Sequence, residues 1–315
     1  MFWHKLTHWE FWPAYIVYFP TFCLWVYYSL ILKNIKFFRF ANPKINNGGL
    51  YGDSKFEIYQ HLPKDSYPKT ILIKKNDDIN ISQLISEHSL EFPLIVKPDV
   101  GCRGFMVQKV NNLNEIKSYR KNLNKDFLIQ ELVKFPHEIG LFYQRYPNKK
   151  AGKVTGITFK KFLMVKGDGE KSIKELLNSN PRHSFQIQKL SQTLNLDEIL
   201  LFGEERIIVP YGNHCRGTEF LDYSHKINPK LEEMINRLLS GIDGFYFGRL
   251  DIRFNTFEEL EDGINFSIIE FNGAKSEPSH IYDPKHNFWY AQKEIFKHNK
   301  ILFETVKIGM SQLKM

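Results

Sequence analysis

Two apolar, β-branched segments in the C-terminal half of the chain place polar side chains at alternating positions. They are GRLDIRF (248–254) and FSIIEFNGAKSEP (266–278). Successive side chains of a strand point to opposite faces, so Glu270 and Asn272 share one face of the second segment. Asp251 lies on the first segment, which is able to pair beside the second. Three such oxygen donors suit Mg²⁺, a hard ion that bridges phosphate oxygens. The pattern predicts paired strands that carry a metal site.

An earlier stretch is typical of a strand, a glycine loop and a second strand. PLIVKP (93–98) is a β-branched run containing Lys97, and the following loop holds Gly101 and Gly104. A lysine at a strand end can reach nucleotide phosphates, and glycines let loop amides approach them closely. A helix and the apolar strand DFLIQELV are expected next, followed by EIGLFYQRY. By itself, this succession also occurs in proteins that bind no nucleotide.

In this order, the segments resemble the ATP-grasp superfamily, near the D-alanine–D-alanine ligases and the cyanophycin-synthetase type. The resemblance covers residues 92–284 and includes GKVTGITFKKFLMVKGDGEKSIKELL, which is similar to the family's strand pair, GDG turn and helix. It implies an α+β fold in which two α+β lobes clasp ATP.

The resemblance also suggests how the chain is divided. An aromatic, hydrophobic N-terminal helix (1–40) and a glycine-rich linker with a small preceding region (41–91) come before the ATP-grasp domain (92–315). Within that domain, residues 92–145 are expected to form the nucleotide lobe and residues 146–315 the central, metal-binding lobe.

Individual roles follow from the same resemblance. It implies that Asp251, Glu270 and Asn272 hold one or two Mg²⁺ ions, or Mn²⁺, against the β- and γ-phosphates of ATP. ATP itself is expected to contact the first lobe: Lys97, Gly101 and Gly104 at the phosphates, Gln130, Glu131 and Val133 at the adenine, and Glu138 at the ribose. A second lysine is expected from the next β-region, where both Lys160 and Lys161 fit.

Three arginines are candidates for stabilising an acyl-phosphate and the oxyanion formed when it is attacked, because a fixed guanidinium meets developing negative charge. Arg249 and Arg253 have the same parity as Asp251, and Arg216 lies in the loop GNHCRGTEF. We prefer Arg249 and take it, with Lys97 and Arg216, as the predicted catalytic set.

The acceptor site is less defined. SEPSH (276–280) follows the metal strand and is expected to line it. The proline-glycine that usually follows the metal asparagine is replaced by Gly273, Ala274 and Lys275, which leaves the acceptor class open. His214 is either a base that contacts substrate or a loop histidine.

The N-terminal segment differs from the rest of the chain. Residues 11–32 carry no charge, but Pro13 and Pro20 interrupt them and aromatic side chains occur along their whole length. Such rings favour the membrane interface. The alternatives are a monotopic or re-entrant membrane element, a true span, and a buried or oligomer-forming helix. We expect membrane attachment, with the basic residues Lys33, Lys36, Arg39 and Lys44 holding the domain on the cytoplasmic side near anionic lipid.

Charge and cysteine content narrow the function classes. The net charge of +8 favours anionic partners, but the basic residues are spread along the chain, so we expect no nucleic-acid partner. Three distant cysteines form neither a disulfide framework nor a metal site. A glycine cluster beside Lys55 is read as a connecting loop, with a phosphate or head-group site as the alternative.

These observations predict an ATP- and Mg²⁺-dependent ligase that activates a carboxylate as an acyl-phosphate and joins it to an amine or a similar nucleophile. Its carboxylate and amine substrates are expected to be small or lipid-linked molecules, with an envelope or lipid-linked substrate at the membrane favoured, and a homodimer is compatible with the fold. The alternatives are an ATP-grasp kinase acting on a hydroxyl and a non-catalytic, membrane-associated nucleotide-binding protein.

Overall fold

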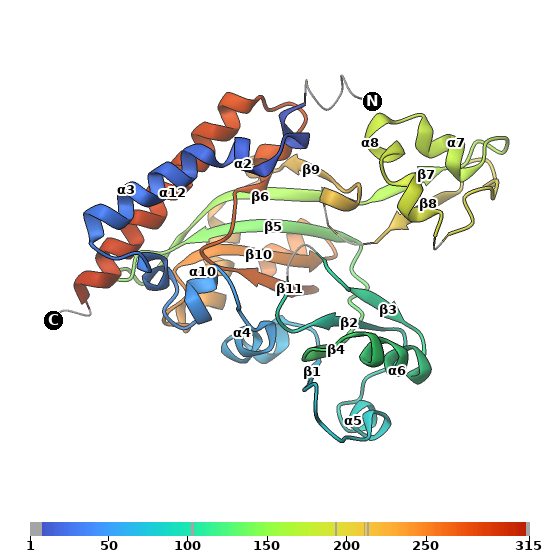
Figure 1. The fold of residues 1–315 in the computed structure, drawn as a ribbon, viewed down its shortest axis with the longest axis horizontal. Helices are drawn as coiled ribbons and strands as arrows, with labels where there is room; N and C mark the ends of the chain where they lie inside the picture. Colours follow the sequence, from blue (N-terminus) through green and yellow to red (C-terminus); the bar gives the residue numbers. More distant parts are fainter. Residues whose placement is uncertain (1–7, 102–103, 193, 211, 213, 313–315) are drawn as a thin grey trace.

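The computed structural model describes residues 8–101, 104–192, 194–210, 212 and 214–312. Two antiparallel sheets with separate helices form the body of the molecule, which confirms the predicted α+β class. In Figure 1 the smaller sheet lies below the larger one, and a hairpin with short helices extends to one side.

The smaller sheet has the strand order β1-β4-β2-β3. Its strands are β1 (Thr70–Ile73), β2 (Leu94–Pro98), β3 (Gln108–Val110) and β4 (Phe127–Glu131). The helices α5 (Ile81–Glu87) and α6 (Leu113–Asn122) pack on it around a core that includes Ile73, Val96, Ile116 and Ile129. Because β1 pairs with β4 along its whole length, this lobe includes residues that precede position 92.

The larger sheet has the strand order β11-β10-β5-β6-β9. Its strands are β5 (His137–Gln144), β6 (Lys153–Lys161), β9 (Glu219–Asp222), β10 (Phe247–Phe254) and β11 (Phe266–Asn272). One face carries Leu141 and Leu250, which pack with Leu239 of α10 (Pro229–Ser240). The strict alternation of a strand turns the intervening residues to the opposite face, where Phe142 and Phe247 pack against Leu302. Site residues on β5 and β10 therefore share the second face.

The N-terminal segment packs along the C-terminal helix. Helices α2 (Ala14–Val17) and α3 (Phe19–Leu32) lie beside α12 (Phe288–Gln312), as Figure 1 shows in blue and red. The Tyr28 ring stacks on Phe303 with centroids 4.2 Å apart, and the Trp25 indole donates to Asn299 Oδ1 at 2.6 Å. Across the described residues, we find no helix with the length and apolar character needed to cross a membrane.

The remaining elements connect these layers. α4 (Lys55–His61) lies between the two sheets, and α11 (Phe257–Asp262) contacts α10. The hairpin of β7 (Leu163–Lys166) and β8 (Glu205–Val209) has its own small core with α7 (Ile173–Asn178) and α9 (Ile187–Leu190), and α8 (Pro181–Ser184) contacts α7. Single 3₁₀ turns are η1 (Trp9–Phe11), η2 (Phe37–Ala41), η3 (Asn46–Gly49), η4 (Lys64–Ser66), η5 (His214–Arg216), η6 (Ser224–Lys226) and η7 (Ser279–Tyr282).

Candidate active site

A cavity of about 1120 Å³ lies between the two sheets and extends under the N-terminal helices. It collects most of the residues that the sequence singles out. They are Lys97, Gly101, Gly104, Gln130, Glu131, Val133, Glu138, Lys160, Arg216, Arg249, Asp251, Arg253, Glu270 and Asn272. Residues separated by more than 170 positions thus line one space.

Four polar residues form a compact group on β10 and β11. Asp251 pairs in register with Glu270, and Arg249 pairs with Asn272. Since residues at alternate positions share a face, all four side chains lie on one side of this strand pair. The predicted grouping of Asp251, Glu270 and Asn272 therefore has its geometric basis in the strand register, and the resemblance assigned the metal role.

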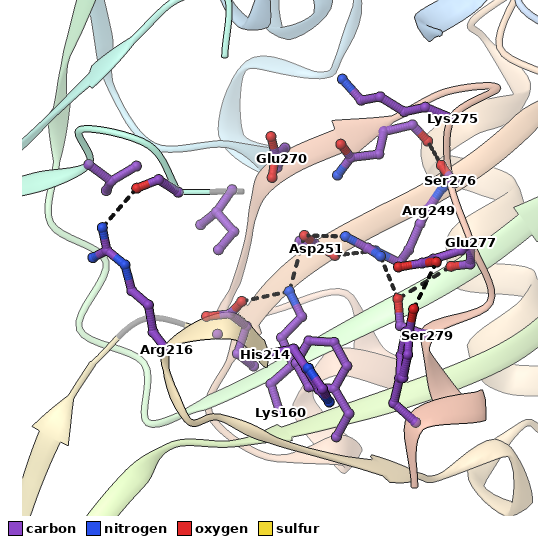
Figure 2. A pocket seen from close by; sticks show the side chains of 18 of the residues that line it. Lys160, His214, Arg216, Arg249, Asp251, Glu270, Lys275, Ser276, Glu277 and Ser279 are labelled. Carbon is purple, nitrogen blue, oxygen red and sulfur yellow. Dashed lines mark hydrogen bonds and ion pairs between the residues drawn. The ribbon is translucent and has the colours of Figure 1, made fainter. Parts of the chain in front are cut away.

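Asp251 is the centre of a buried charge network, shown in Figure 2. Arg249 donates to its two carboxylate oxygens at 2.8 and 3.1 Å, and Lys160 lies 3.0 Å from Oδ2. Burial by itself would raise the pKa of Asp251, but the two cations outweigh it and hold this pKa below its usual range. Asp251 is therefore held as a carboxylate.

These donors fit a divalent cation that is shared with phosphate. Glu270 is partly exposed, and the Lys55 ammonium lies 3.8 Å from its carboxylate. The Asn272 amide nitrogen is buried with no hydrogen-bond partner among the described residues, so its amide is not already committed there. Within the described ranges no three His, Cys, Asp or Glu residues cluster as a metal site. Two carboxylates and an amide match Mg²⁺, which typically takes one or two carboxylates and completes its shell with phosphates and water.

Lys97 enters the cavity from the smaller sheet. Its ammonium donates to the Tyr59 hydroxyl at 3.1 Å and to the Ile269 carbonyl at 3.2 Å. Burial lowers the pKa of Lys97 to about 8. These contacts place a weakly solvated amine against β11, beside Glu270.

Lys55 at the start of α4 also lines the cavity. Its ammonium donates to the carbonyls of Asp99 at 3.2 Å and Gly101 at 2.9 Å. Sequence reasoning favoured a connecting loop here; in the structure, Lys55 is a cavity cation that contacts the glycine loop.

The segment after β4 forms the other wall. Gln130 is buried and donates to the Thr70 hydroxyl at 2.7 Å, while the Glu131 amide donates to the Lys69 carbonyl. Leu132 and Val133 are half-buried and line the cavity. Glu138 is buried and contacts Lys160 at 2.8 Å and Arg253 at 3.1 Å. The predicted adenine and ribose roles remain predictions.

The structure distinguishes the two candidate lysines. Lys160 is 3% exposed and lies in the cavity between Glu138 and Asp251. Lys161 points to the opposite face of β6, where its exposed side chain meets Glu219 at 3.1 Å. Neighbouring residues of a strand face opposite ways, so the predicted cofactor residue Lys161 does not line this cavity, and Lys160 takes that place.

The three arginines occupy different parts of the cavity. Arg249 donates to the Ser279 hydroxyl as well as to Asp251. Arg253 lies toward the segment after β4, donating to the carbonyls of Phe135 and Pro210. Arg216 donates to the Gly104 carbonyl at 3.0 Å and so joins η5 to the glycine loop. Of the three, Arg249 is the one beside Asp251 and η7.

The cavity also contains Glu277, from the segment expected to line the acceptor site, and His214, for which the sequence left two roles open. Glu277 accepts from the Tyr282 hydroxyl at 3.1 Å, and desolvation raises the pKa of Glu277 to about 7. His214 is paired with Glu10 at 2.9 Å, which favours the loop-histidine interpretation. Trp12, Tyr18 and Trp25 also line the cavity, although their sequence pattern indicated a membrane element and nothing about a pocket.

With this geometry in place, comparison with known proteins identifies the fold. Residues 53–141 match the RimK-like ATP-grasp domain. The chain has an ATP-grasp fold. The matched range contains α4, the whole smaller sheet, Lys97 and Glu138. The resemblance inferred from the sequence is confirmed.

Similarity to solved structures is distant. A D-alanine–D-alanine ligase from Bacillus anthracis complexed with ATP shares 14% identity at a TM-score of 0.46, covering 89% of this chain and 70% of that one. The VanG D-Ala:D-Ser ligase from Enterococcus faecalis shares 13% identity at a TM-score of 0.46, covering 81% of this chain and 61% of that one. A bifunctional glutathione synthetase from Pasteurella multocida shares 13% identity at a TM-score of 0.39. The match covers 77% of this chain and only 36% of that protein. No curated protein sequence matches.

Proposed function

We propose that this ATP-grasp protein is an ATP- and Mg²⁺-dependent ligase that activates a carboxylate as an acyl-phosphate and joins it to an amine. The supporting observation is the convergence of Lys97, Lys160, Arg249, Asp251 and Glu270 in one cavity. Cations and hard oxygen donors in a partly closed site are what phosphoryl transfer requires, because it depends mainly on positioning and charge neutralisation.

The chemistry has two balanced steps. A carboxylate oxygen of the substrate bonds to the γ-phosphorus of ATP while the bond from that phosphorus to the β,γ-bridging oxygen breaks, releasing ADP. The amine then bonds to the acyl carbon, phosphate leaves, and the nitrogen loses a proton. Mg²⁺, when bound, neutralises phosphate charge.

The residues of this chain divide this work. Lys97 and Lys160 are suited to meet phosphate charge. Asp251, Glu270 and Asn272 are suited to hold the cation. Arg249 is fixed by Asp251 and Ser279, so its guanidinium is already oriented for an acyl-phosphate or oxyanion.

Calorimetry tests nucleotide binding first. Wild type and Glu270→Ala are titrated with ATP with and without Mg²⁺, and Glu258→Ala serves as control because Glu258 is exposed on α11. We expect Mg²⁺-dependent binding that weakens in Glu270→Ala alone. ATP binding unaffected by both Mg²⁺ and Glu270→Ala would contradict the metal assignment.

Product analysis then tests the reaction class. A panel of amino, hydroxy and fatty acids is offered with Mg-ATP and hydroxylamine, which converts an acyl-phosphate to a hydroxamate. Hydroxamate formation together with ADP release supports a ligase. A stable phosphorylated alcohol would instead indicate a kinase.

We also propose that the protein works at the cytoplasmic side of an anionic membrane. Exposed apolar side chains gather on α2 and α3, including Phe19, Phe22 and Leu30, which are 62–72% exposed. No acidic residue occurs between Glu10 and Asp53. An apolar surface beside uncompensated lysines and arginine suits an anionic interface.

Vesicle sedimentation tests the membrane proposal. Because Trp25 and Tyr28 of α3 help to form the core, deleting residues 1–40 would disturb the fold. The double variant Phe19→Ser, Phe22→Ser changes exposed positions instead. We expect wild type to bind phosphatidylglycerol vesicles better than phosphatidylcholine vesicles, and the variant to bind several-fold less. Equal binding of variant and wild type would refute this surface.

A further inference from the structure

The cavity continues beyond Arg249 and Ser279 into an apolar space under the N-terminal helices. We call this space the aromatic chamber. Its walls are side chains of α2, α3, α12 and the turn before them: Trp12, Val17, Tyr18, Thr21, Trp25, Ile295, His298, Asn299 and Leu302. The residues come from opposite ends of the chain, and the chamber exists because α3 packs along α12.

Several polar groups of the aromatic chamber are paired with one another. The Trp25 indole donates to Asn299 at 2.6 Å, the hydroxyls of Tyr18 and Tyr282 lie 2.9 Å apart, and His298 contacts Thr155 at 3.0 Å. Burial lowers the pKa of His298 to about 4, so its ring is neutral. Polar groups that are satisfied in this way offer little to a charged ligand.

The negative charge of Glu10, at the edge of the aromatic chamber, is already paired with a neighbouring arginine. Glu10 also lines the cavity, but its carboxylate is held by Arg182 and His214, each at 2.9 Å. The charged groups suited to a substrate head are therefore those around Arg249.

The turn η7 joins the two parts of the cavity. Ser279, at its start, accepts from Arg249, and Tyr282, at its end, contacts Tyr18 of the aromatic chamber. A molecule whose polar head lies at Arg249 and Ser279 can therefore extend its other end along η7 into the chamber. The volume of about 1120 Å³ exceeds the roughly 300–1,000 Å³ of pockets for single small ligands, which is consistent with two substrates bound together.

From this continuity we propose that one substrate is an amphiphile, with a carboxylate head at Arg249 and an apolar tail in the aromatic chamber. The inference rests on the proposed function for the role of the head, and on the chamber alone for the tail. Helix α3 lines the chamber through Thr21 and Trp25 and exposes Phe22 and Val26 outward. A single helix thus separates the chamber from the surface proposed to contact lipid.

A fluorescent acid tests the chamber. The full chain is titrated with 11-(dansylamino)undecanoate and with dansylglycine, which has the same fluorophore and carboxylate without the long chain. We expect the long acid to bind at least tenfold more tightly. Equal weak binding of both acids would overturn the inference.

Two matched variants locate the binding. Thr21→Trp adds bulk inside the chamber, and Cys23→Trp adds the same bulk on the exposed side of the same helix. Thr21→Trp is expected to lower the affinity for the long acid tenfold or more, and Cys23→Trp to leave it unchanged. Tight binding that survives Thr21→Trp would overturn the assignment. Thermal unfolding of both variants verifies that they fold. If Thr21→Trp does not fold, Leu302→Phe takes its place and fills the chamber from α12.

Calorimetry with Mg-ATP on the same samples separates the two proposals. Nucleotide binding without binding of the long acid refutes the chamber and leaves the ligase proposal intact. Binding of the long acid without nucleotide binding supports the chamber and refutes the ligase. The long acid is then offered either in solution or dissolved in phosphatidylglycerol vesicles, to assign its source. If the double variant Phe19→Ser, Phe22→Ser takes up less acid from vesicles but the same amount from solution, the acid comes from the membrane. If its uptake is unchanged in both cases, the substrate is a free amphiphile. Both of these results support the chamber.

Discussion

Lys160 on β6 and Asp251 on β10 form a 3.0 Å ion pair across β5, the strand that lies between them in the sheet. On β5, Gly140 lies directly opposite Asp251 in the strand register. A Cβ there would lie 3.3 Å from Asp251 Oδ1 and 3.0 Å from the Arg249 Cδ, closer than most side-chain contacts. The absence of a side chain at Gly140 therefore leaves space for the charge network.

Gly140→Val should disturb this network. The added methyl groups would push Arg249 and Asp251 from their present positions, and such overpacking costs about 1–3 kcal/mol of stability. We expect Mg²⁺-dependent ATP binding to weaken by about tenfold, the factor that ~1.4 kcal/mol represents. Calorimetry and urea unfolding measure both effects. Gly241→Val is the control, because a Cβ at Gly241 meets no atom within 4 Å; equal effects at both positions would argue against the packing explanation.

Lys160→Met and Lys161→Met should differ sharply. Removing Lys160 leaves Glu138 and Asp251 short of a buried cation, and breaking a buried pair typically costs about 3–5 kcal/mol. Lys161 forms an exposed pair with Glu219, and such pairs contribute about 0–1 kcal/mol. Urea unfolding and ATP titration of the two variants make the comparison. If Lys161→Met lost nucleotide binding while Lys160→Met kept it, the structural placement of the two lysines would be refuted.

Nucleotide binding should take up protons at alkaline pH. Lys97 has a pKa of about 8 because it is buried, so free protein loses this charge as the pH rises through 8. Bound phosphate favours the ammonium, and ATP binding near pH 9 should draw in a proton that it does not need near pH 7. Calorimetry in two buffers of different ionisation heat counts the proton. Lys97→Arg, which stays charged, should show no uptake from this source; identical uptake in that variant would assign the proton elsewhere.

The pH dependence of stability should report on Glu277. Its folded pKa of about 7 lies above the ordinary glutamate value of 4.5, so the folded state binds this proton more tightly than the unfolded state. Stability from this group is present at low pH and is lost as the pH rises from about 4.5 through 7. Glu277→Gln cannot lose a proton, so the melting temperature of this variant minus that of wild type should increase between pH 5 and 8. A constant difference over this range would contradict the raised pKa.

Local sequence patterns determined the parts of the site that depend on spacing along one strand. Glu270 and Asn272 are two residues apart, so strand alternation alone puts them on one face. Lys97 and the glycines after it were recognised for the same reason, since a strand end and a turn are local features. The ATP-grasp resemblance rested on such segments and on their order.

The tertiary structure decided which face turns toward the cavity and what comes to it from far away. Alternation placed Lys160 and Lys161 on opposite faces, but only the pairing of β6 with β5 and β9 turned Lys160 inward. Lys55 and β1 joined the nucleotide side through contacts that no local period encodes. The aromatic N-terminal segment lines the same cavity because it packs on α12, more than 250 residues away. Apolar burial is non-directional, so the sequence showed that this segment would be buried or would face lipid, but it did not show which part of the protein would cover it.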